Sequence, residues 1–194
     1  MLNLQMMAAP RVGSPVSSPR SPQSAKHGEL IRLAKDLSEL DLPSQVALSF
    51  PHGMSHSQLF EVSMTPDEGC YAGGTFLFQF RVPDSYPSDP PRVRCLTQVF
   101  HPCIDDAGHV DMSLLGDDWR PDMSIKHIIY GLWRLFLLPE SEDSLNTAAG
   151  SLMHSDRSGF ERAVEEAVHS GATIEGKYYE QAVGQRNVHS RNED

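Results

Sequence analysis

The fold is predicted by the stretch TFLFQFRV, residues 75–82, in which every second side chain is large and apolar, from Phe76 to Val82. Successive side chains of a strand point to opposite faces of a sheet, so this alternation predicts a half-buried strand. The segment YPSDPP, residues 86–91, follows it. Its prolines lack the N–H that a strand ladder requires, so we expect an extended connection here rather than another strand.

Further segments surround this strand. Apolar residues at helical spacing predict one helix before residue 43 and three helices after residue 121. Short runs rich in β-forming residues predict three more strands, and little periodicity is visible between Thr97 and Pro121. This order predicts an α+β fold with helices packed on a four-stranded antiparallel sheet and a long, ordered, functional loop. The expected strands are residues 46–50, 59–65, 75–82 and 92–96.

Composition excludes several classes of protein. The 194 residues carry 16 basic and 26 acidic side chains, a net charge of −10, which argues against binding nucleic acid. Three cysteines do not make a disulfide scaffold, and no apolar stretch reaches the roughly 20 residues of a membrane span. No secretory signal is recognisable at the N-terminus. We therefore expect a cytoplasmic or nuclear protein without a cofactor, a metal or a membrane partner.

The chain divides into three parts. Residues 1–28 are rich in proline and serine and contain no acidic residue, which predicts a disordered tail. Its apolar tip, which includes Leu2 and Leu4, is a candidate docking peptide. Residues 29–183 form the expected domain, and residues 184–194 a polar C-terminal tail.

A set of motifs, taken in order, resembles the ubiquitin-conjugating enzyme (UBC) family over most of the chain, from about Leu30 to Tyr179. These motifs are Tyr86-Pro87, Pro90-Pro91, His101-Pro102, Trp119 and Pro121. A second set resembles the branch that conjugates the Nedd-type modifier. It comprises Asp67-Glu68-Gly69, the run Ile128 to Leu132, Leu135-Phe136-Leu137, Glu142-Asp143, Leu145-Asn146 and Tyr178-Tyr179-Glu180.

The resemblance implies a UBC fold and a place in a modifier-conjugating pathway. In this family an activating enzyme passes a ubiquitin-like modifier to a cysteine as a thioester, and a substrate lysine then attacks it. The implied partners are the modifier, its activating enzyme, and a ligase or partner conjugating enzyme. In the Nedd-type branch the N-terminal tip docks on the activating enzyme, which points to Leu2 and Leu4.

The chain departs from the family at the centre of this chemistry. In GHVDM, residues 108–112, Asp111 stands where the resemblance places the nucleophilic cysteine. Cys103 stands where it places an asparagine that holds the oxyanion. A carboxylate cannot form a thioester, which predicts a non-catalytic protein that binds the modifier or pathway enzymes. Asp143 matches the acid that positions the lysine, although Ser144 replaces the adjacent family proline.

Alternatives remain open. Cys103 could act as a displaced nucleophile if His101 and His109 lower the pKa of its thiol, which would make the chain an active transferase. His101, Cys103, His109 and Asp111 are also possible zinc ligands, although their spacing matches no zinc motif. A third alternative is that Asp111 is an altered residue in an otherwise active enzyme.

Overall fold

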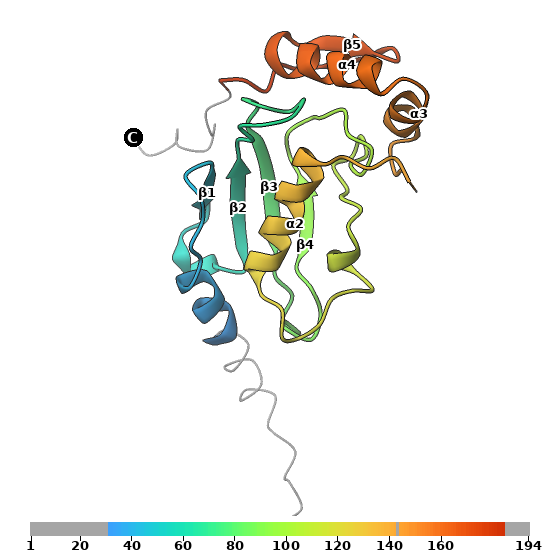
Figure 1. Cartoon of the computed structure of the whole chain (residues 1–194). Helices are drawn as coiled ribbons and strands as arrows, with labels where there is room; N and C mark the ends of the chain where they lie inside the picture. Colours follow the sequence, from blue (N-terminus) through green and yellow to red (C-terminus); the bar gives the residue numbers. More distant parts are fainter. Residues whose placement is uncertain (1–30, 143, 185–194) are drawn as a thin grey trace, which may run out of the picture.

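The computed structural model describes residues 31–142 and 144–184. Its centre is an antiparallel sheet in which the four strands lie in chain order (Figure 1). Each strand overlaps the segment expected from the sequence, and the four-stranded α+β fold is confirmed. The strands are β1 (Val46–Ser49), β2 (Leu59–Met64), β3 (Phe76–Arg81) and β4 (Arg92–Cys95).

One face of this sheet carries the core. The β2–β3 register pairs Phe60 with Phe80, and their rings stack with centroids 5.0 Å apart. The helix α2 (Ile125–Leu137) crosses this face (Figure 1). Its Phe136 ring lies 4.5 Å from that of Phe76, and both are fully buried. Ser124 caps α2 through a capping box with His127, so the expected start of this helix is confirmed.

The described N-terminal residues 31–38 are helical. Within them, Arg32 donates to the carbonyl oxygens of Pro121 and Met123, at 3.2 and 2.7 Å. Asp36 accepts from the Tyr86 hydroxyl and pairs with Arg32 at 2.9 Å. This network joins the N-terminal helix to the proline-rich connection and to the segment before α2.

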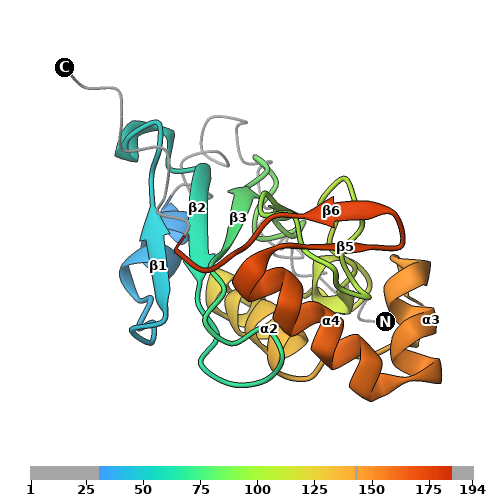
Figure 2. The same ribbon diagram turned by 90° about the horizontal axis from the view of Figure 1, so that it is seen from above.

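The C-terminal part covers one end of the sheet and consists of α3 (Thr147–Ser155), α4 (Arg157–Ser170) and a small hairpin (Figures 1 and 2). The hairpin pairs β5 (Ala172–Ile174) with β6 (Lys177–Tyr179) and was not expected from the sequence. Its two turn residues, Glu175 and Gly176, both have positive φ, as a tight hairpin turn requires.

No helix among the described residues is long and apolar enough to cross a membrane. The expected N-terminal tail, residues 1–28, lies outside the described residues, as does nearly all of the expected C-terminal tail. Leu2, Leu4 and Asp143 are likewise outside them, and their expected roles remain predictions.

Candidate functional site

The segment between β4 and α2 is the ordered loop that the sequence predicts. It contains isolated bridges between His101 and Ile104 and between Ile104 and Val110, and one short 3-10 helix, η2 (Ser113–Leu115). The Asp111 N–H donates to the Cys103 carbonyl oxygen at 2.8 Å. The loop therefore folds back on itself and brings positions 103 and 111 together, as the resemblance implies.

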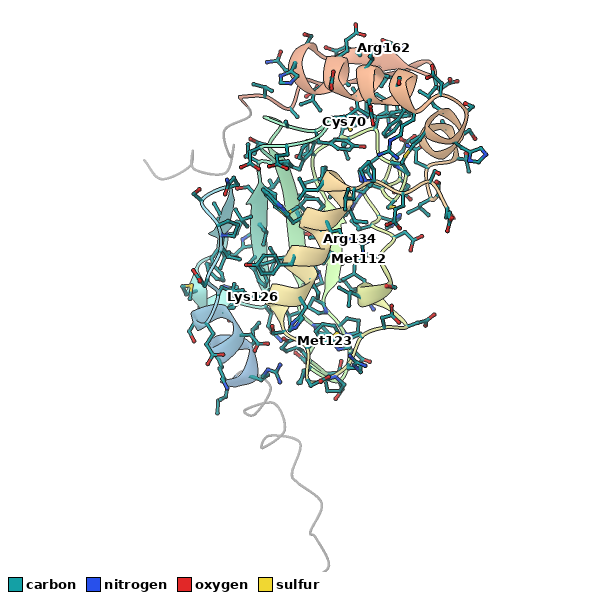
Figure 3. All side chains as sticks on the ribbon, in the orientation of Figure 1. Cys70, Met112, Met123, Lys126, Arg134 and Arg162 are labelled. Carbon is teal, nitrogen blue, oxygen red and sulfur yellow. The ribbon has the colours of Figure 1, made fainter. Side chains whose placement is uncertain are left out.

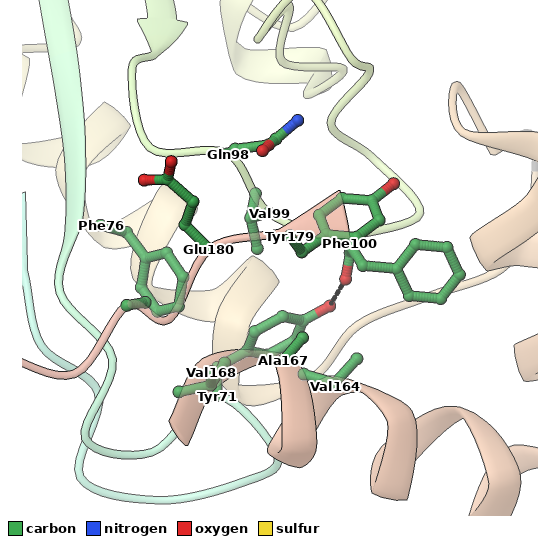
Figure 4. A pocket seen from close by; sticks show the side chains of 11 residues that line it. Tyr71, Phe76, Gln98, Val99, Phe100, Val164, Ala167, Val168, Tyr179 and Glu180 are labelled. Carbon is green, nitrogen blue, oxygen red and sulfur yellow. Dashed lines mark hydrogen bonds between the residues drawn. The ribbon is translucent and has the colours of Figure 1, made fainter. Parts of the chain in front are cut away.

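The first residues of this loop are held by the core. The Tyr71 hydroxyl donates to the Phe100 carbonyl oxygen at 2.8 Å, beside a small cavity lined by residues of β3, α4 and β6 (Figure 4). The Phe100 ring meets that of Tyr179 edge to face, with centroids 5.6 Å apart. These contacts fix the backbone next to His101.

His101 anchors the loop to α2. Its ring is fully buried and lies 5.2 and 5.1 Å from the rings of Tyr71 and Phe136. Nδ1 accepts from the Cys103 N–H at 3.0 Å, so the proton is on Nε2, which donates to the Leu135 carbonyl oxygen at 3.0 Å. That carbonyl belongs to the last turn of α2 and has no partner within the helix.

Burial gives this histidine a fixed charge state. Removal from water lowers the pKa of His101 to about 4, and the hydrogen bond to Leu135 opposes this shift only in part. The imidazole is therefore neutral at physiological pH. It holds the loop by two hydrogen bonds and offers no positive charge to Cys103.

The Cys103 thiol lies in surroundings that keep its proton. The side chain is partly buried, with Sγ 4.0 Å from the Glu140 carbonyl oxygen. Burial, followed by the negative charges of Asp111 and Glu140, raises the pKa of Cys103 to about 11. The expectation that neighbouring histidines lower this pKa is therefore wrong. The sequence shows that His101 and His109 are close to Cys103 along the chain, but it does not show which groups these histidines form hydrogen bonds with.

His109, the second histidine expected to act on Cys103, is occupied elsewhere. Its Nδ1 lies 2.8 Å from a carboxylate oxygen of Asp105, in an exposed pair. Asp105 also accepts from the backbone N–H groups of Ala107 and His109, which closes a tight turn before Asp111. These hydrogen bonds lower the pKa of Asp105 against the opposing effect of its burial.

Asp111 itself is exposed, and the structure records no hydrogen bond or ion pair of its carboxylate to a described residue. The possible zinc ligands do not converge either. Both nitrogens of His101 are engaged in hydrogen bonds, and His109 pairs with Asp105. Within residues 31–142 and 144–184 there is no group of three or more His, Cys, Asp or Glu side chains that could hold a metal ion.

Two segments distant in sequence support the loop from outside. The Asn146 N–H donates to the Pro102 carbonyl oxygen at 2.9 Å, and the Asn146 side chain caps α3. On the other side, Lys177 of β6 forms an ion pair with Asp106. Sequence reasoning did not predict either support, because the motif that contains Asn146 does not show what Asn146 contacts, and Lys177 belongs to no motif.

The loop packs against α2 at Gly131, where the helix has no side chain. A Cβ atom at Gly131 would lie 2.7 Å from Sδ of Met112 and 3.1 Å from a methyl carbon of Leu114. Glycine inside a helix lowers the stability of the helix by about 1 kcal/mol relative to alanine. A glycine at position 131 of the sequence is therefore a signal that another segment approaches the helix closely there. Lys126 and Arg134 lie along the same helix, with Met112 beside it (Figure 3). The exposed face of α2 thus borders the loop that carries Asp111.

A sheet crossed by one helix, with this folded loop beside the helix, defines the class of protein. The family model described as "Ubiquitin-conjugating enzyme" matches residues 32–168, more than half of the chain. The chain therefore belongs to the ubiquitin-conjugating enzyme family.

Its relatives narrow the class further. The NEDD8-conjugating enzyme Ubc12 of Arabidopsis thaliana is 46% identical over 144 residues, which cover 74% of this chain and 78% of the relative. The Nedd8-conjugating enzyme UbcE2M of Drosophila melanogaster is 41% identical over 160 residues, 82% and 87% of the two chains. The solved structure of S. cerevisiae Ubc12 matches with a TM-score of 0.73 and 39% identity, and covers 80% of this chain and 86% of that one. The expected resemblance to the Nedd-type branch is confirmed.

Proposed function

We propose that this chain works in the NEDD8 pathway as a conjugating-enzyme fold that binds the modifier or the pathway enzymes, and that it does not carry the modifier as a thioester. The relatives named NEDD8-conjugating enzymes support the pathway. The observation that carries the proposal is the exposed carboxylate of Asp111 at the position that the family motif assigns to the nucleophile.

The chemistry at position 111 follows from the side chain. A thioester requires a sulfur atom that attacks the activated carbonyl carbon and displaces the activating enzyme's own thiolate. A carboxylate oxygen is a much weaker nucleophile, and the product would be an anhydride that water cleaves. Asp111 can therefore contact a modifier but cannot hold it covalently for transfer.

Cys103 is the second candidate, because the Asp111 N–H is bonded to its carbonyl oxygen and the thiol is only partly buried. With the pKa raised to about 11, fewer than about one thiol in a thousand is ionised at neutral pH. The geometry places sulfur near the site, and the charges of Asp111 and Glu140 suppress its nucleophilic form. This combination favours binding over transfer.

A protein contact beside the site is supported by the face of α2. Tyr130 and Arg134 lie one turn apart on it, and Tyr130 is an exposed aromatic side chain with Lys126 5.7 Å from its ring centroid. Arg134 pairs with Glu140 at 2.9 Å, which ties this face to the segment that approaches Cys103. Aromatic and arginine side chains are enriched at protein interfaces.

The decisive experiment is a loading assay. The chain is incubated with ATP, NEDD8 and the NEDD8-activating enzyme, and the products are separated on gels with and without a reducing agent. An active relative serves as the positive control. We expect no reducible adduct, together with measurable non-covalent binding of NEDD8 or of the activating enzyme by calorimetry. A reducible adduct that disappears in Cys103→Ser would establish the transferase alternative, and absence of both adduct and binding would remove the proposed role.

The docking role of Leu2 and Leu4 has its own test. Deletion of residues 1–7 should weaken binding to the activating enzyme without changing the unfolding temperature, because the tip is expected to act as a tethered peptide. The paired change Leu2→Ala with Leu4→Ala should reproduce most of the loss, whereas Met6→Ala with Met7→Ala serves as the control. Unchanged affinity after the deletion would exclude the tip as a docking element.

A further inference from the structure

A mostly apolar groove of about 530 Å³ lies between the proline-rich connection and the loop that carries Asp111. Three of its lining residues, Val93, Val110 and Leu115, are only partly buried, so part of each side chain is open to a ligand. The volume is within the range of pockets that enclose small ligands, about 300–1,000 Å³. The groove can therefore take up a few apolar side chains. Its apolar lining consists of Pro83, Pro90, Pro91, Val93, Val110 and Leu115.

The charged side chains of this groove nearly cancel. Arg92 and Asp89 contribute one charge of each sign. His109 also lines the groove, and it pairs with Asp105. The groove thus has no net charge that would select an acidic or a basic ligand, and its apolar lining decides what binds there.

The first described residues lie close to the segments that border the groove. Arg32 donates to the carbonyl oxygens of Pro121 and Met123. From the same segment, the Trp119 indole donates to the Pro87 carbonyl oxygen at 2.9 Å, in the connection that lines the groove. Figure 1 shows the N-terminal helix, the connection between β3 and β4 and the start of α2 at one end of the sheet. Residues 1–30 are therefore attached to the domain at the end where the groove lies.

Residues 1–30 contain a suitable apolar ligand. Five of the first seven residues are leucine or methionine, and residues 8–30 connect this tip to the domain. A flexible chain of that length would span about 26 Å on average. A domain of about 150 residues has a radius of gyration of about 15 Å. The connecting segment is therefore long enough for the tip to reach the groove.

Charge also favours contact between this segment and the domain. Residues 1–28 carry three basic side chains and no acidic one, whereas residues 29–194 carry 13 basic and 26 acidic side chains, a net charge of −13. Asp117 and Asp118 are exposed, and they lie in the chain between Leu115 of the groove and Pro121, beside which the described chain begins. The structure records no ion pair of either carboxylate with a described residue. Their charge attracts a basic segment to this surface.

We propose that the apolar tip of this chain binds in the groove of its own domain. Leu2 and Leu4 then pack against the apolar lining, and the basic residues of the first 28 face Asp117 and Asp118. A tether gives its ligand an effective concentration in the millimolar range, so an affinity of about 1 mM fills the groove about half of the time. Contact this weak leaves the unfolding temperature nearly unchanged. The inference goes beyond the proposed function, because it holds whether or not the tip also docks on the activating enzyme.

The first test replaces Leu4 in the full chain with the photoreactive amino acid benzoylphenylalanine and locates the cross-link by mass spectrometry. We expect most of the product to be cross-linked within one chain, to residues 83–93 or 109–115. The yield should not change on dilution, because the tip and the groove belong to the same molecule.

A pair of variants separates the groove from the rest of the surface. Val93→Lys should lower the yield of this cross-link about threefold or more, because the tip would have to cover a charged side chain. The matched control is Leu96→Lys, which makes the same change at an exposed leucine just beyond β4 and outside the groove. It should leave the yield unchanged.

The second test leaves the sequence of the described domain unchanged, so misfolding of the groove does not enter. The paired change Leu2→Asn with Leu4→Asn removes the apolar side chains of the tip without altering the charge. In the full chain it should shift the amide resonances of Val93 and Val110. The control, Ser17→Asn with Ser18→Asn, makes two changes to the same residue type behind the tip and should leave those resonances in place.

The proposal is overturned if no cross-link forms or if the cross-links map mainly to other residues. It is also overturned if the yield falls on dilution, which would mean that the tip binds a second copy of the chain. Equal yields in Val93→Lys and Leu96→Lys would exclude the groove as the binding site. Unshifted resonances in the variant with both leucines changed would exclude the tip as the ligand.

Discussion

His101 and Asp111 lie on the same loop, and their surroundings differ in almost every respect. The His101 ring is fully buried between two aromatic rings and makes two hydrogen bonds, whereas the Asp111 side chain is exposed and is held to the loop through its backbone N–H. The difference teaches that buried contacts hold this loop in place at residue 101, whereas the side chain at position 111 makes no recorded hydrogen bond or ion pair with a described residue.

The largest effect is expected from placing a sulfur atom at position 111. The double variant Asp111→Cys with Cys103→Asn gives the loop the two residues that the resemblance to the family assigns to these positions. If the buried anchor alone sets the geometry, this variant should form a reducible NEDD8 adduct where the starting chain forms none, as seen on non-reducing gels. Asp111→Ser with Cys103→Asn is the control, and any adduct that it forms should resist reduction. A double variant that binds the activating enzyme but stays unloaded would show that residues 103 and 111 are not the only obstacle to loading.

The second effect concerns the buried end of the loop and its dependence on pH. The unfolded chain binds a proton at His101 near pH 6.5, whereas burial lowers the pKa in the folded state to about 4. Between these values the unfolded state binds more protons, so the free energy of unfolding falls as the pH is lowered from 6.5 to 4, by about 3 kcal/mol in total.

Chemical denaturation at pH 7, 5.5 and 4.5 measures this dependence. His101→Gln keeps a donor and an acceptor and should flatten the dependence, while His56→Gln, at an exposed histidine, should leave the slope nearly unchanged. Identical slopes in all three proteins would mean that His101 titrates normally and does not anchor the loop as a neutral ring.

The third effect lies between the two ends, at Cys103. Burial is the largest cause of the raised pKa of Cys103, and the negative charge of Asp111 is the second largest. Removing that charge should therefore lower the pKa of Cys103. Asp111→Asn should therefore speed alkylation by iodoacetamide at pH 7.5 roughly three- to tenfold. Mass spectrometry of the modified peptide separates Cys103 from Cys70 and Cys95, whose pKa values are raised by burial.

Glu140→Gln should give a smaller increase in the same direction, because Glu140 contributes less to the raised pKa. Glu166→Gln, an exposed change on α4, is the matched control and should leave the rate unchanged. Equal rates in Asp111→Asn and the starting chain would contradict the electrostatic account of this thiol.

The smallest effect is expected where the loop meets α2. Gly131→Ala improves the helix propensity by about 1 kcal/mol but forces Met112 and Leu114 to move. Overpacking typically costs 1–3 kcal/mol, so we expect a net loss of about 1 kcal/mol in the free energy of unfolding. The added variant Met112→Ala should relieve the crowding and return the gain in propensity. A stabilising Gly131→Ala would show that the loop does not rest on the helix.

The sequence predicts the scaffold better than the site for a physical reason. Strands such as residues 75–82 carry a regular alternation that burial on one face imposes, and the helix capped by Ser124 carries the matching helical pattern. The hairpin of β5 and β6 was missed because three-residue strands are too short to show a period. Its Glu175-Gly176 turn was the available signal.

The site depends on contacts that leave no periodic trace. The motif around His101 and Cys103 identifies the loop, but it does not show that His101 is buried and neutral. Nor does it show that Asp111 and Glu140 are close enough to raise the pKa of the thiol. The sign of that pKa shift came out opposite to the expectation because it depends on distances across the fold rather than on spacing along the chain.

The ion pair between Lys177 and Asp106 has a practical consequence. A shortened protein that ended after α4 would keep the sheet of β1 to β4, the helix α2 and every residue of the loop. It would also contain all the sequence motifs of the loop. It would nevertheless lack the brace on the turn that leads to Asp111, together with the Tyr179 ring that packs on Phe100. Comparisons of activity between this chain and its relatives therefore require the last strand to be kept in both.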